Sequence, residues 1–190
     1  MTRGLLIVIS GPGGVGKDTL IERLRERNPA LRYSVSYTTR PRRPYEVHDE
    51  HYTFVAPEEF QRLVDRGDLL EHAVVGGHLY GTSAARVAEL QAAGHDVILK
   101  IDVQGADQVR ARRPDGVFVF LAPPSMDELF RRRVERGTET PEVLQARQRL
   151  AVWEMTFAGH YDHVVVNDDL ERAVREVEAL LEGERAGRVR

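Results

Sequence analysis

The feature that most constrains this chain is a glycine-rich segment near its start. It reads Gly11-Pro12-Gly13-Gly14-Val15-Gly16-Lys17, which has the spacing G-x-x-x-x-G-K. An apolar run at 4–10 precedes it and predicts a buried strand, and an amphipathic run at 17–27 follows it and predicts a helix. In this context the backbone N–H groups close around a phosphate, and the lysine reaches the terminal phosphates. We therefore predict a nucleotide phosphate loop, which Asp18 and Thr19 complete.

The same segment also fits a second pattern, G-x-G-x-x-G, through Gly11, Gly13 and Gly16. That pattern marks a dinucleotide site, which needs an acidic residue about 20 positions further on. Residues 34–40 read Ser-Val-Ser-Tyr-Thr-Thr-Arg and contain no acid. Together with Lys17, this favours the phosphate loop over the dinucleotide site.

The residue after Lys17 is Asp18, at a position where a hydroxyl usually helps to hold Mg²⁺. Three roles are open for Asp18: a direct Mg²⁺ ligand, a partner of the metal's water molecules, or a cap of the helix N-terminus, where a carboxylate is favoured. We favour the cap and keep the metal role as the second hypothesis. The next residue, Thr19, is expected to face an α-phosphate.

Composition excludes several classes of protein. The 190 residues carry a formal net charge of −3, and none of them is cysteine. This excludes a disulfide scaffold, a thiolate nucleophile and a cysteine-bearing zinc finger. The near-neutral charge does not indicate nucleic acid or an acidic membrane as a partner. Because the longest early apolar run, Leu5–Ile9, is too short for a signal peptide or a membrane span, we expect a cytoplasmic protein with one domain.

The basic residues are unevenly chosen, since 25 of the 27 are arginine and only Lys17 and Lys100 are lysine. Most of the arginines are expected at solvated positions. A retained lysine, in contrast, suggests a site that needs a compact ammonium group rather than a guanidinium group. Lys17 fits that expectation in the phosphate loop, whereas the pattern assigns no clear role to Lys100.

Strands and helices alternate along the rest of the chain. Buried strands are predicted at 96–102, 117–121 and 163–167, and helices at 104–110, 126–135, 141–158 and 170–182. Ser125 and Glu128 form a capping box, and Pro141 suits a first helical turn. This alternation predicts a doubly wound, parallel α/β sheet with three layers.

Two stretches interrupt the alternation. Residues 34–86 are rich in Tyr, Thr, Pro and Arg and contain short strand-like pieces, which indicates an inserted, partly antiparallel substrate lobe. Residues 126–157 are helical and highly charged, which indicates a lid. The expected single domain therefore has a core of residues 1–33, 87–125 and 158–190, with the insertion at 34–86 and the lid at 126–157.

The insertion holds a second candidate site. Arg40 and Arg43 stand three residues apart on a proline-bounded loop, with serine and tyrosine hydroxyls nearby, and such a set suits a dianionic phosphate. A carboxylate such as Glu71 can accept paired N–H donors from one face of a guanine. Taken singly, each of these is more often a solvated loop residue, but as a set they indicate a site.

These motifs resemble those of the guanylate kinase family. The resemblance runs from the phosphate loop through Pro123-Pro124-Ser125 and Arg136-Gly137-Thr138 to Val165-Val166-Asn167-Asp168-Asp169, and it is most specific from Thr38-Thr39-Arg40 to Tyr52. It implies the P-loop NTPase fold, a doubly wound parallel sheet in three α/β/α layers with an inserted, mixed α+β GMP-binding lobe and a helical lid. It also implies transfer of the γ-phosphoryl group of ATP to GMP or dGMP, giving ADP and GDP, with Mg²⁺ as cofactor.

The resemblance also implies roles for individual residues. The GMP phosphate is expected on Ser36, Arg40, Arg43, Tyr52 and Tyr80. The guanine is expected on Glu71, Thr82 and Asp102. Lys17 and the lid arginines Arg132, Arg136 and Arg147 are expected at the ATP phosphates as catalytic groups, and Asn167 near the adenine.

The sequence departs from the family pattern at three positions. Tyr45 stands in place of a usual glycine, His51 in place of an aspartate, and Lys100 in place of an acid. Lys100 lies two residues before Asp102, so it leaves the rate and the handling of the metal open more than the substrate class.

Two other functions are weighed. A ribose 1,5-bisphosphate kinase shares the fold, but it does not need the GMP-reading set Arg40, Arg43, Tyr52, Glu71 and Tyr80. A non-catalytic, kinase-like binding domain typically has a degraded phosphate loop, whereas this chain keeps Lys17 and its lid arginines. We expect small-molecule substrates, with neither nucleic acid nor a membrane as partner. The sequence does not distinguish a monomer from a dimer.

Overall fold

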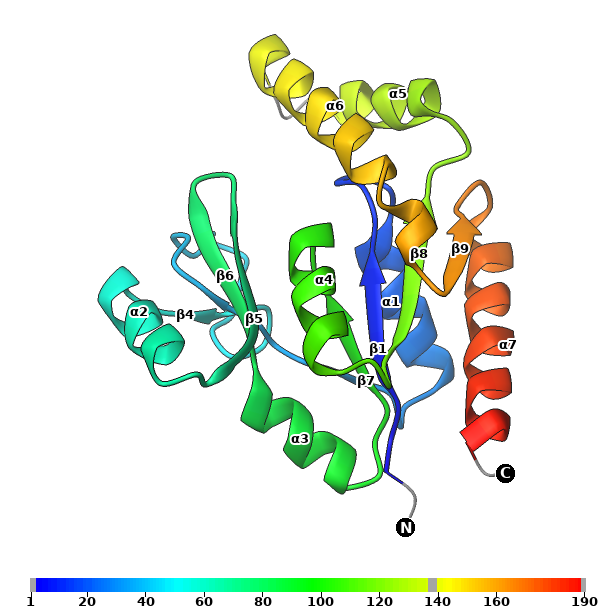
Figure 1. Ribbon diagram of the computed structural model, residues 1–190. Coiled ribbons are helices and arrows are strands. Elements are labelled where there is room, and N and C mark those ends of the chain that lie inside the picture. Colours follow the sequence, from blue (N-terminus) through cyan, green and yellow to red (C-terminus); the bar gives the residue numbers. More distant parts are fainter. Residues whose placement is uncertain (1–2, 137–139, 189–190) are drawn as a thin grey trace. The chain divides into compact units, whose positions relative to one another are not determined.

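The computed structural model describes residues 3–136 and 140–188, except for the side chains of Arg136 and Arg188 (Figure 1). It divides into two units. Unit 1 comprises Met1–Ile7 and Ala30–Gly116, and unit 2 comprises Val8–Pro29 and Val117–Arg190. The first strand, β1 (Leu6–Ser10), contributes residues to both units.

The main sheet has the strand order β2-β7-β1-β8-β9 within the described residues. The other four strands are β2 (Arg32–Tyr33), β7 (Val97–Lys100), β8 (Val117–Ala122) and β9 (His163–Val166). β2 pairs in parallel with β7, and β8 pairs in parallel with β9. Every residue of β1 and β8 is buried, as expected for strands covered on both faces. The predicted parallel α/β sheet with flanking helices is confirmed.

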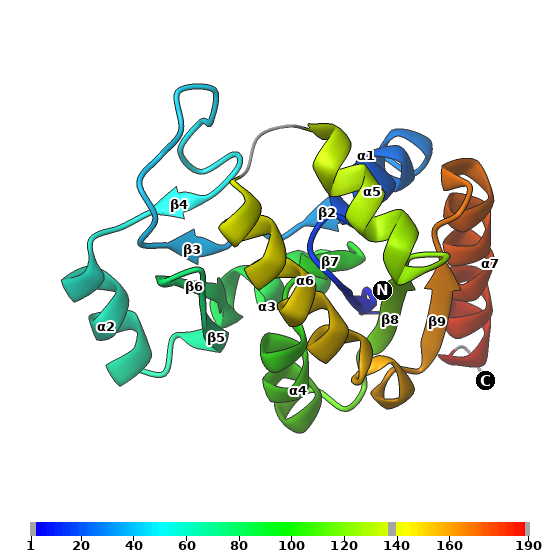
Figure 2. The same ribbon diagram turned by 90° about the horizontal axis from the view of Figure 1, so that it is seen from above.

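Unit 2 contains the helices that surround the C-terminal strands. They are α1 (Lys17–Arg27), α5 (Met126–Arg136), α6 (Pro141–Met155) and α7 (Leu170–Arg188), with a short 3₁₀ turn at Ala158–His160. α7 packs against β9 and α1 (Figures 1 and 2). Ser125 caps α5 as predicted, because its Oγ accepts a hydrogen bond from Glu128 N at 3.1 Å. The last helix continues beyond its predicted end at 182.

Unit 1 contains a second, mixed sheet with the strand order β4-β3-β6-β5. Its strands are β3 (Tyr37–Thr38), β4 (Thr53–Phe54), β5 (Leu69–Val75) and β6 (His78–Ser83). β5 and β6 form an antiparallel hairpin, whose turn has positive φ angles at Gly76 and Gly77, as the tight two-residue hairpin turn requires. The predicted insertion is therefore partly antiparallel, although the division into core, insertion and lid stays a prediction.

Two helices of unit 1 were not predicted from the sequence. α2 (Pro57–Asp65) packs Phe60 and Leu63 against Leu69 of β5. Proline at its first position followed by two glutamates was the missed signal. α3 (Ala84–Ala92) directly follows β6, and Ser83 caps it by accepting a hydrogen bond from Arg86 N at 3.3 Å. α4 (Val103–Arg112) agrees with its prediction.

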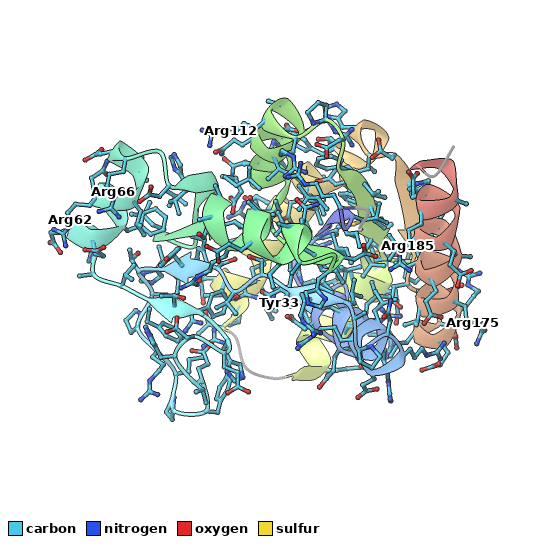
Figure 3. The ribbon with its side chains drawn as sticks, turned by 90° about the horizontal axis from the view of Figure 1, so that it is seen from below. Tyr33, Arg62, Arg66, Arg112, Arg175 and Arg185 are labelled. Carbon is cyan, nitrogen blue, oxygen red and sulfur yellow. The ribbon has the colours of Figure 1, made fainter. Side chains whose placement is uncertain are left out.

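Many arginines lie at solvated positions, as expected. Arg62 and Arg66 are exposed in and after α2, and Arg175 and Arg185 are exposed on α7 (Figure 3). Among the described residues, no helix combines the length and the apolar character that crossing a membrane requires.

Candidate active site

The phosphate loop of unit 2 connects β1 to α1. Gly11, Gly14 and Gly16 have φ angles of 137°, 86° and 103°, a region that favours glycine. A Cβ atom at Gly11 would lie 2.1 Å from the carbonyl oxygen of Leu121, and one at Gly16 would lie 2.5 Å from Asn167 Nδ2. The path of the loop therefore requires glycine at these positions, as the motif predicts.

Lys17 folds back over this loop. Its Nζ donates hydrogen bonds to Gly11 O at 2.5 Å and to Pro12 O at 3.1 Å. Asp18 lies in the first turn of α1, where its carboxylate meets the positive end of the helix dipole. The N-cap position is Gly16, and no described side chain caps it, so Asp18 is the second residue of the helix and not the cap that we favoured. Thr19 is exposed on the same helix.

Asn167 braces the loop from the end of β9. Its side chain is buried, and Nδ2 donates a hydrogen bond to Val15 O at 2.8 Å. Arg132 on α5 donates to Asn167 O at 3.2 Å and to Glu128 Oε1 at 2.8 Å. The expected adenine contact of Asn167 stays a prediction, but its amide already has a structural role in the phosphate loop.

The other two lid arginines, Arg136 and Arg147, lie at the end of α5 and within α6. Arg147 is exposed on α6, and the side chain of Arg136 lies outside the described residues.

Two buried residues at the phosphate loop were not predicted from the sequence. Arg133 on α5 donates to Gly13 O, and Glu154 on α6 accepts a hydrogen bond from Gly13 N at 3.3 Å. The run of three arginines at 131–133 was a signal for the first, whereas nothing in the sequence indicated Glu154.

Arg40 is the centre of the predicted acceptor site in unit 1. It donates to both carboxylate oxygens of Glu46, at 2.6 and 3.0 Å, and from Nε to Tyr80 Oη at 3.2 Å. Glu46 is buried and also accepts a hydrogen bond from Arg43 N at 2.7 Å. The Arg40 hydrogen bonds lower the pKa of Glu46 to about 2 despite its burial, and they raise the pKa of Arg40. Glu46, which the sequence analysis missed, therefore shapes the loop that carries both arginines.

Aromatic rings complete this cluster. The Tyr52 ring lies edge-on to the Tyr80 ring, with 5.8 Å between centroids, and Arg40 Cζ is 5.5 Å from the Tyr52 centroid. Lys100 Nζ lies 5.9 Å from the same Tyr52 centroid and 5.7 Å from that of Tyr33. The structure thus places Lys100 beside the predicted acceptor-phosphate residues.

The remaining two predicted phosphate ligands, Ser36 and Arg43, lie within four residues of Arg40 in the sequence. Arg43 Nη1 donates to Tyr45 Oη at 2.8 Å. Ser36 is buried just before β3, and its carbonyl oxygen accepts a hydrogen bond from Thr53 N at 2.9 Å.

The predicted guanine-reading residues form a buried cluster. Glu71 on β5 is 3% exposed, and Thr82 Oγ1 on β6 donates to its Oε1 at 2.6 Å. Asp102 caps α4 by accepting a hydrogen bond from Gly105 N at 2.9 Å. Burial, and secondarily the charge of Asp102, raises the pKa of Glu71 to about 7, although the Thr82 hydrogen bonds oppose this shift. The structure brings all three predicted residues together around one carboxyl group.

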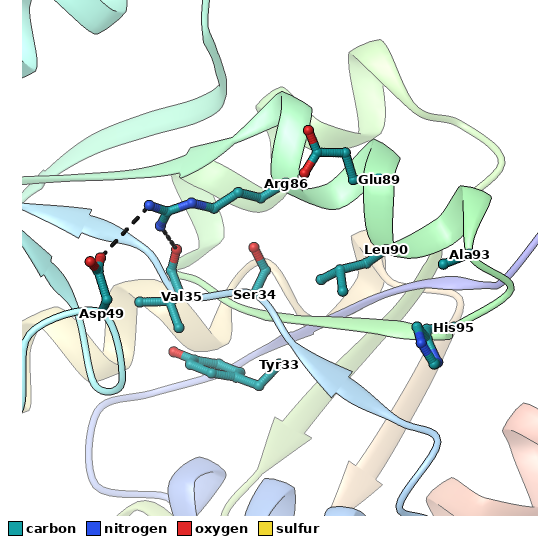
Figure 4. A pocket seen from close by; sticks show the side chains of 9 residues that line it. All are labelled: Tyr33, Ser34, Val35, Asp49, Arg86, Glu89, Leu90, Ala93 and His95. Carbon is teal, nitrogen blue, oxygen red and sulfur yellow. Dashed lines mark hydrogen bonds and ion pairs between the residues drawn. The ribbon is translucent and has the colours of Figure 1, made fainter.

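A separate cavity of about 440 Å³ in unit 1 contains none of the predicted site residues (Figure 4). It is lined by Tyr33, Ser34, Val35, Asp49, Arg86, Glu89, Leu90, Ala93 and His95. Arg86 crosses it, with Nη1 donating to Val35 O at 3.4 Å and Nη2 3.7 Å from Asp49 Oδ1. Its lining carries two carboxylates, Asp49 and Glu89, beside Arg86, which does not favour it as a nucleotide phosphate site.

The fold and the phosphate loop define a class, the P-loop kinases. Two solved structures share this fold at low identity: a shikimate kinase from Bacteroides thetaiotaomicron (19% identity, TM-score 0.51, covering 94% of this chain and 98% of that one) and a gluconokinase from Sinorhizobium meliloti (20%, TM-score 0.53, covering 96% and 94%). Within this class, the model of the guanylate kinase family matches residues 3–184, and the chain belongs to that family.

Similar proteins from several organisms are guanylate kinases, which is consistent with this membership. The guanylate kinase of Desulfitobacterium hafniense is 48% identical over 182 residues, which cover 96% of this chain and 91% of the relative. That of Symbiobacterium thermophilum is 48% identical over 188 residues, covering 99% and 89%. The crystal structure of guanylate kinase from Anaplasma phagocytophilum has a TM-score of 0.79 at 34% identity and covers 96% of this chain and 87% of that one.

Proposed function

We propose that this protein transfers the γ-phosphoryl group of ATP to GMP, giving ADP and GDP. The observation that carries this proposal is the buried carboxyl group of Glu71, which is held by Thr82 beside Asp102. Guanine offers N–H donors on one edge, and a carboxylate accepts two of them at once. A ribose bisphosphate has hydroxyl donors but no flat edge with two N–H groups, so it matches this acceptor less well. The alternative sugar-phosphate kinase is therefore not favoured.

The acceptor phosphate would bind to the cluster around Arg40. Arg40 is already oriented by Glu46 and Tyr80, and Arg43 lies on the same loop. A fixed guanidinium group binds a phosphate with less loss of side-chain entropy than a mobile one. Ser36, Tyr52 and Tyr80 would add hydroxyl groups to this site. dGMP lacks only the ribose 2′-hydroxyl, so we propose it as a weaker acceptor.

The donor phosphates would bind to the loop at 11–19. Lys17 would exchange its contacts with the loop carbonyls for the terminal phosphates of ATP. Arg132, Arg136 and Arg147 are proposed to stabilise the charge on the transferred group. The attacking group is an oxygen of the GMP phosphate, which is already anionic near neutral pH. The chain therefore needs no general base, and its work is positioning and charge stabilisation.

Mg²⁺ is proposed as the cofactor. When bound, Mg²⁺ neutralises charge on the ATP phosphates. In the described part of the chain, no group of three His, Cys, Asp or Glu is placed to hold a metal. This fits a kinase metal, which is usually held by one or two carboxylates together with substrate phosphates. Asp18, in the first turn of α1, is the residue proposed to contribute from the protein.

A coupled assay of ADP production tests the function. The purified protein would be given ATP and Mg²⁺ with GMP, dGMP, AMP, UMP, CMP or ribose 1,5-bisphosphate. We expect turnover with GMP, weaker turnover with dGMP and background rates with the others. Turnover with ribose 1,5-bisphosphate alone would support the sugar-phosphate kinase. Binding of GMP without turnover would support a non-catalytic binding domain.

A further inference from the structure

Gly13, in the middle of the phosphate loop, is held on both sides by charged residues from the following helices. Its carbonyl oxygen accepts hydrogen bonds from Arg133 Nε, at 3.0 Å, and from Arg133 Nη2. Its N–H donates to Glu154 Oε2 at 3.3 Å. Arg133 comes from α5 and Glu154 from α6, so two separate helices hold the peptide groups on either side of one Cα atom.

Both side chains are buried, which is unusual for these residue types. Arg133 is 5% exposed and Glu154 is 7% exposed. Burial of a charged group costs free energy unless polar partners compensate for the lost water. Part of that compensation comes from the backbone of Gly13. The two residues therefore do more than fill space, because their charged ends are directed at the loop.

The Gly13 N–H is the kind of group that a phosphate loop uses to bind phosphate oxygens. Glu154 presents an anionic oxygen to this same donor. One N–H makes one strong hydrogen bond, so a phosphate oxygen and the Glu154 carboxylate cannot both use it fully. The present contact, at 3.3 Å, is longer than the usual N–H···O distance of about 2.9–3.0 Å and is therefore weak enough to be exchanged.

We propose that Glu154 is an internal anion at the Gly13 N–H that a nucleotide phosphate must displace, while Arg133 keeps the Gly13 carbonyl group in place. Both act as positioning residues of the phosphate loop. The inference rests on the proposed function, because it assumes that phosphates bind at this loop. It predicts that Glu154 lowers the affinity for the donor nucleotide. It also predicts that phosphate binding changes the surroundings of residues on α6.

The first test replaces the carboxylate by its neutral isostere, Glu154→Gln. Calorimetry with ADP and with inorganic pyrophosphate measures the dissociation constants at fixed Mg²⁺ and salt. Since the competing charge is removed, we expect both ligands to bind about three- to tenfold more tightly. Glu142→Gln is the matched control, because Glu142 is exposed in the first turn of the same helix and the charge change is the same. Unchanged or weaker binding by Glu154→Gln would overturn the proposal.

A second test needs no variant and so does not depend on whether Glu154→Gln folds. The single tryptophan of the chain, Trp153, precedes Glu154 on α6. Its ring packs edge-on against that of Phe157, with 4.8 Å between the ring centroids. If pyrophosphate displaces Glu154, the surroundings of Trp153 change and its emission shifts during a pyrophosphate titration at constant ionic strength. An unchanged emission spectrum at saturation would count against displacement. If neither ADP nor pyrophosphate binds the wild-type protein, it is the proposed function that fails rather than this inference.

Discussion

Among single residues, Glu71 has the strongest consequence for pH dependence. Burial raises the pKa of its carboxyl group to about 7, so the group becomes protonated as the pH falls through neutrality. Guanine N–H donors need the ionised form as acceptor. We therefore expect the KM for GMP to rise as the pH falls from 8 to 6, approaching about tenfold per pH unit below the pKa. Steady-state kinetics across this range would measure it.

The GMP phosphate also titrates near pH 6, so this prediction needs a control. Binding of guanosine, which has no phosphate, isolates the contribution of Glu71. In Glu71→Gln we expect weak guanosine binding with little dependence on pH. A wild-type affinity for guanosine that is constant between pH 8 and pH 6 would argue against Glu71 as the guanine acceptor.

The same pKa shift has the opposite effect on folding stability, which it lowers at the high pH that favours GMP binding. An unfolded glutamate titrates near 4.5, whereas folded Glu71 titrates near 7. The folded state therefore holds the proton more tightly, and the stability linked to it is fully present below pH 4.5 and is lost as the pH rises through 7. Because glutamine carries no such charge, Glu71→Gln should raise the Tm at pH 8 relative to the wild type and should do so less at pH 5. Equal differences in Tm at both pH values would contradict the shift.

Lys100 is the second residue that the structure makes testable. It and Arg40 lie within 6 Å of the centroid of the same Tyr52 ring, so its ammonium group adds positive charge where the acceptor phosphate is proposed to bind. We expect Lys100→Met to raise the KM for GMP about three- to tenfold and Lys100→Arg to raise it less. Arg66→Gln removes the same charge at an exposed position of unit 1 and should leave the KM unchanged. An unaltered KM in Lys100→Met would make Lys100 a bystander.

At the level of elements, the start of α4 is shaped to accommodate Glu71. A Cβ atom at Gly105, in the first turn of α4, would lie 2.5 Å from Glu71 Oε2. Alanine has a higher helix propensity than glycine by about 1 kcal/mol, so the helix itself would tolerate Gly105→Ala. We expect this variant to remain folded but to raise the KM for GMP more than tenfold, because the carboxyl group must move.

A second glycine-to-alanine change provides the control for Gly105→Ala. Gly183 lies within α7, and among the described residues no atom outside its own helix backbone and chain neighbours comes within 4 Å of the position of its Cβ. Gly183→Ala should raise the Tm and leave the kinetics unchanged. If Gly105→Ala also leaves the kinetics unchanged, Glu71 does not need its present position to bind GMP.

The elements also show what sequence patterns can and cannot predict. The apolar runs that became β1 and β8 were predicted because burial on both faces leaves a continuous hydrophobic signal. β2 is only two residues long and half-buried, so it leaves no such signal. The site residues Arg133, Glu154 and Glu46 were missed for a different reason. Their contacts depend on how helices and loops fold onto a backbone group, and the local sequence pattern does not predict such contacts.

For the whole molecule, net charge cannot explain the attraction of the substrates. The chain has a formal charge of −3, and ATP and GMP are both anions, so attraction must come from local groups. The proposed GMP ligands all lie in unit 1, and the proposed ATP ligands, from the phosphate loop to Asn167, all lie in unit 2. Each unit therefore carries the proposed ligands of one substrate.

This division predicts that the two ligands can be uncoupled by single substitutions. We expect Lys17→Ala to weaken the binding of pyrophosphate at least tenfold and to lower kcat by about 10²- to 10³-fold, because the main cation of the loop is lost. Its affinity for GMP should remain that of the wild type. Glu71→Gln should show the reverse, with weak GMP binding and unchanged pyrophosphate binding.

Thermal shifts with each ligand alone, backed by calorimetry, would measure all four combinations of variant and ligand. A ligand at 100 times its dissociation constant stabilises the folded state by about 2.7 kcal/mol, so a lost site is seen as a lost shift in Tm. Circular dichroism would verify that each variant is folded. If Lys17→Ala weakened GMP binding as much as pyrophosphate binding, the two ligand sets would not be separate. The assignment of GMP to unit 1 alone would then have to be abandoned, because a residue of unit 2 would be contributing to the acceptor site.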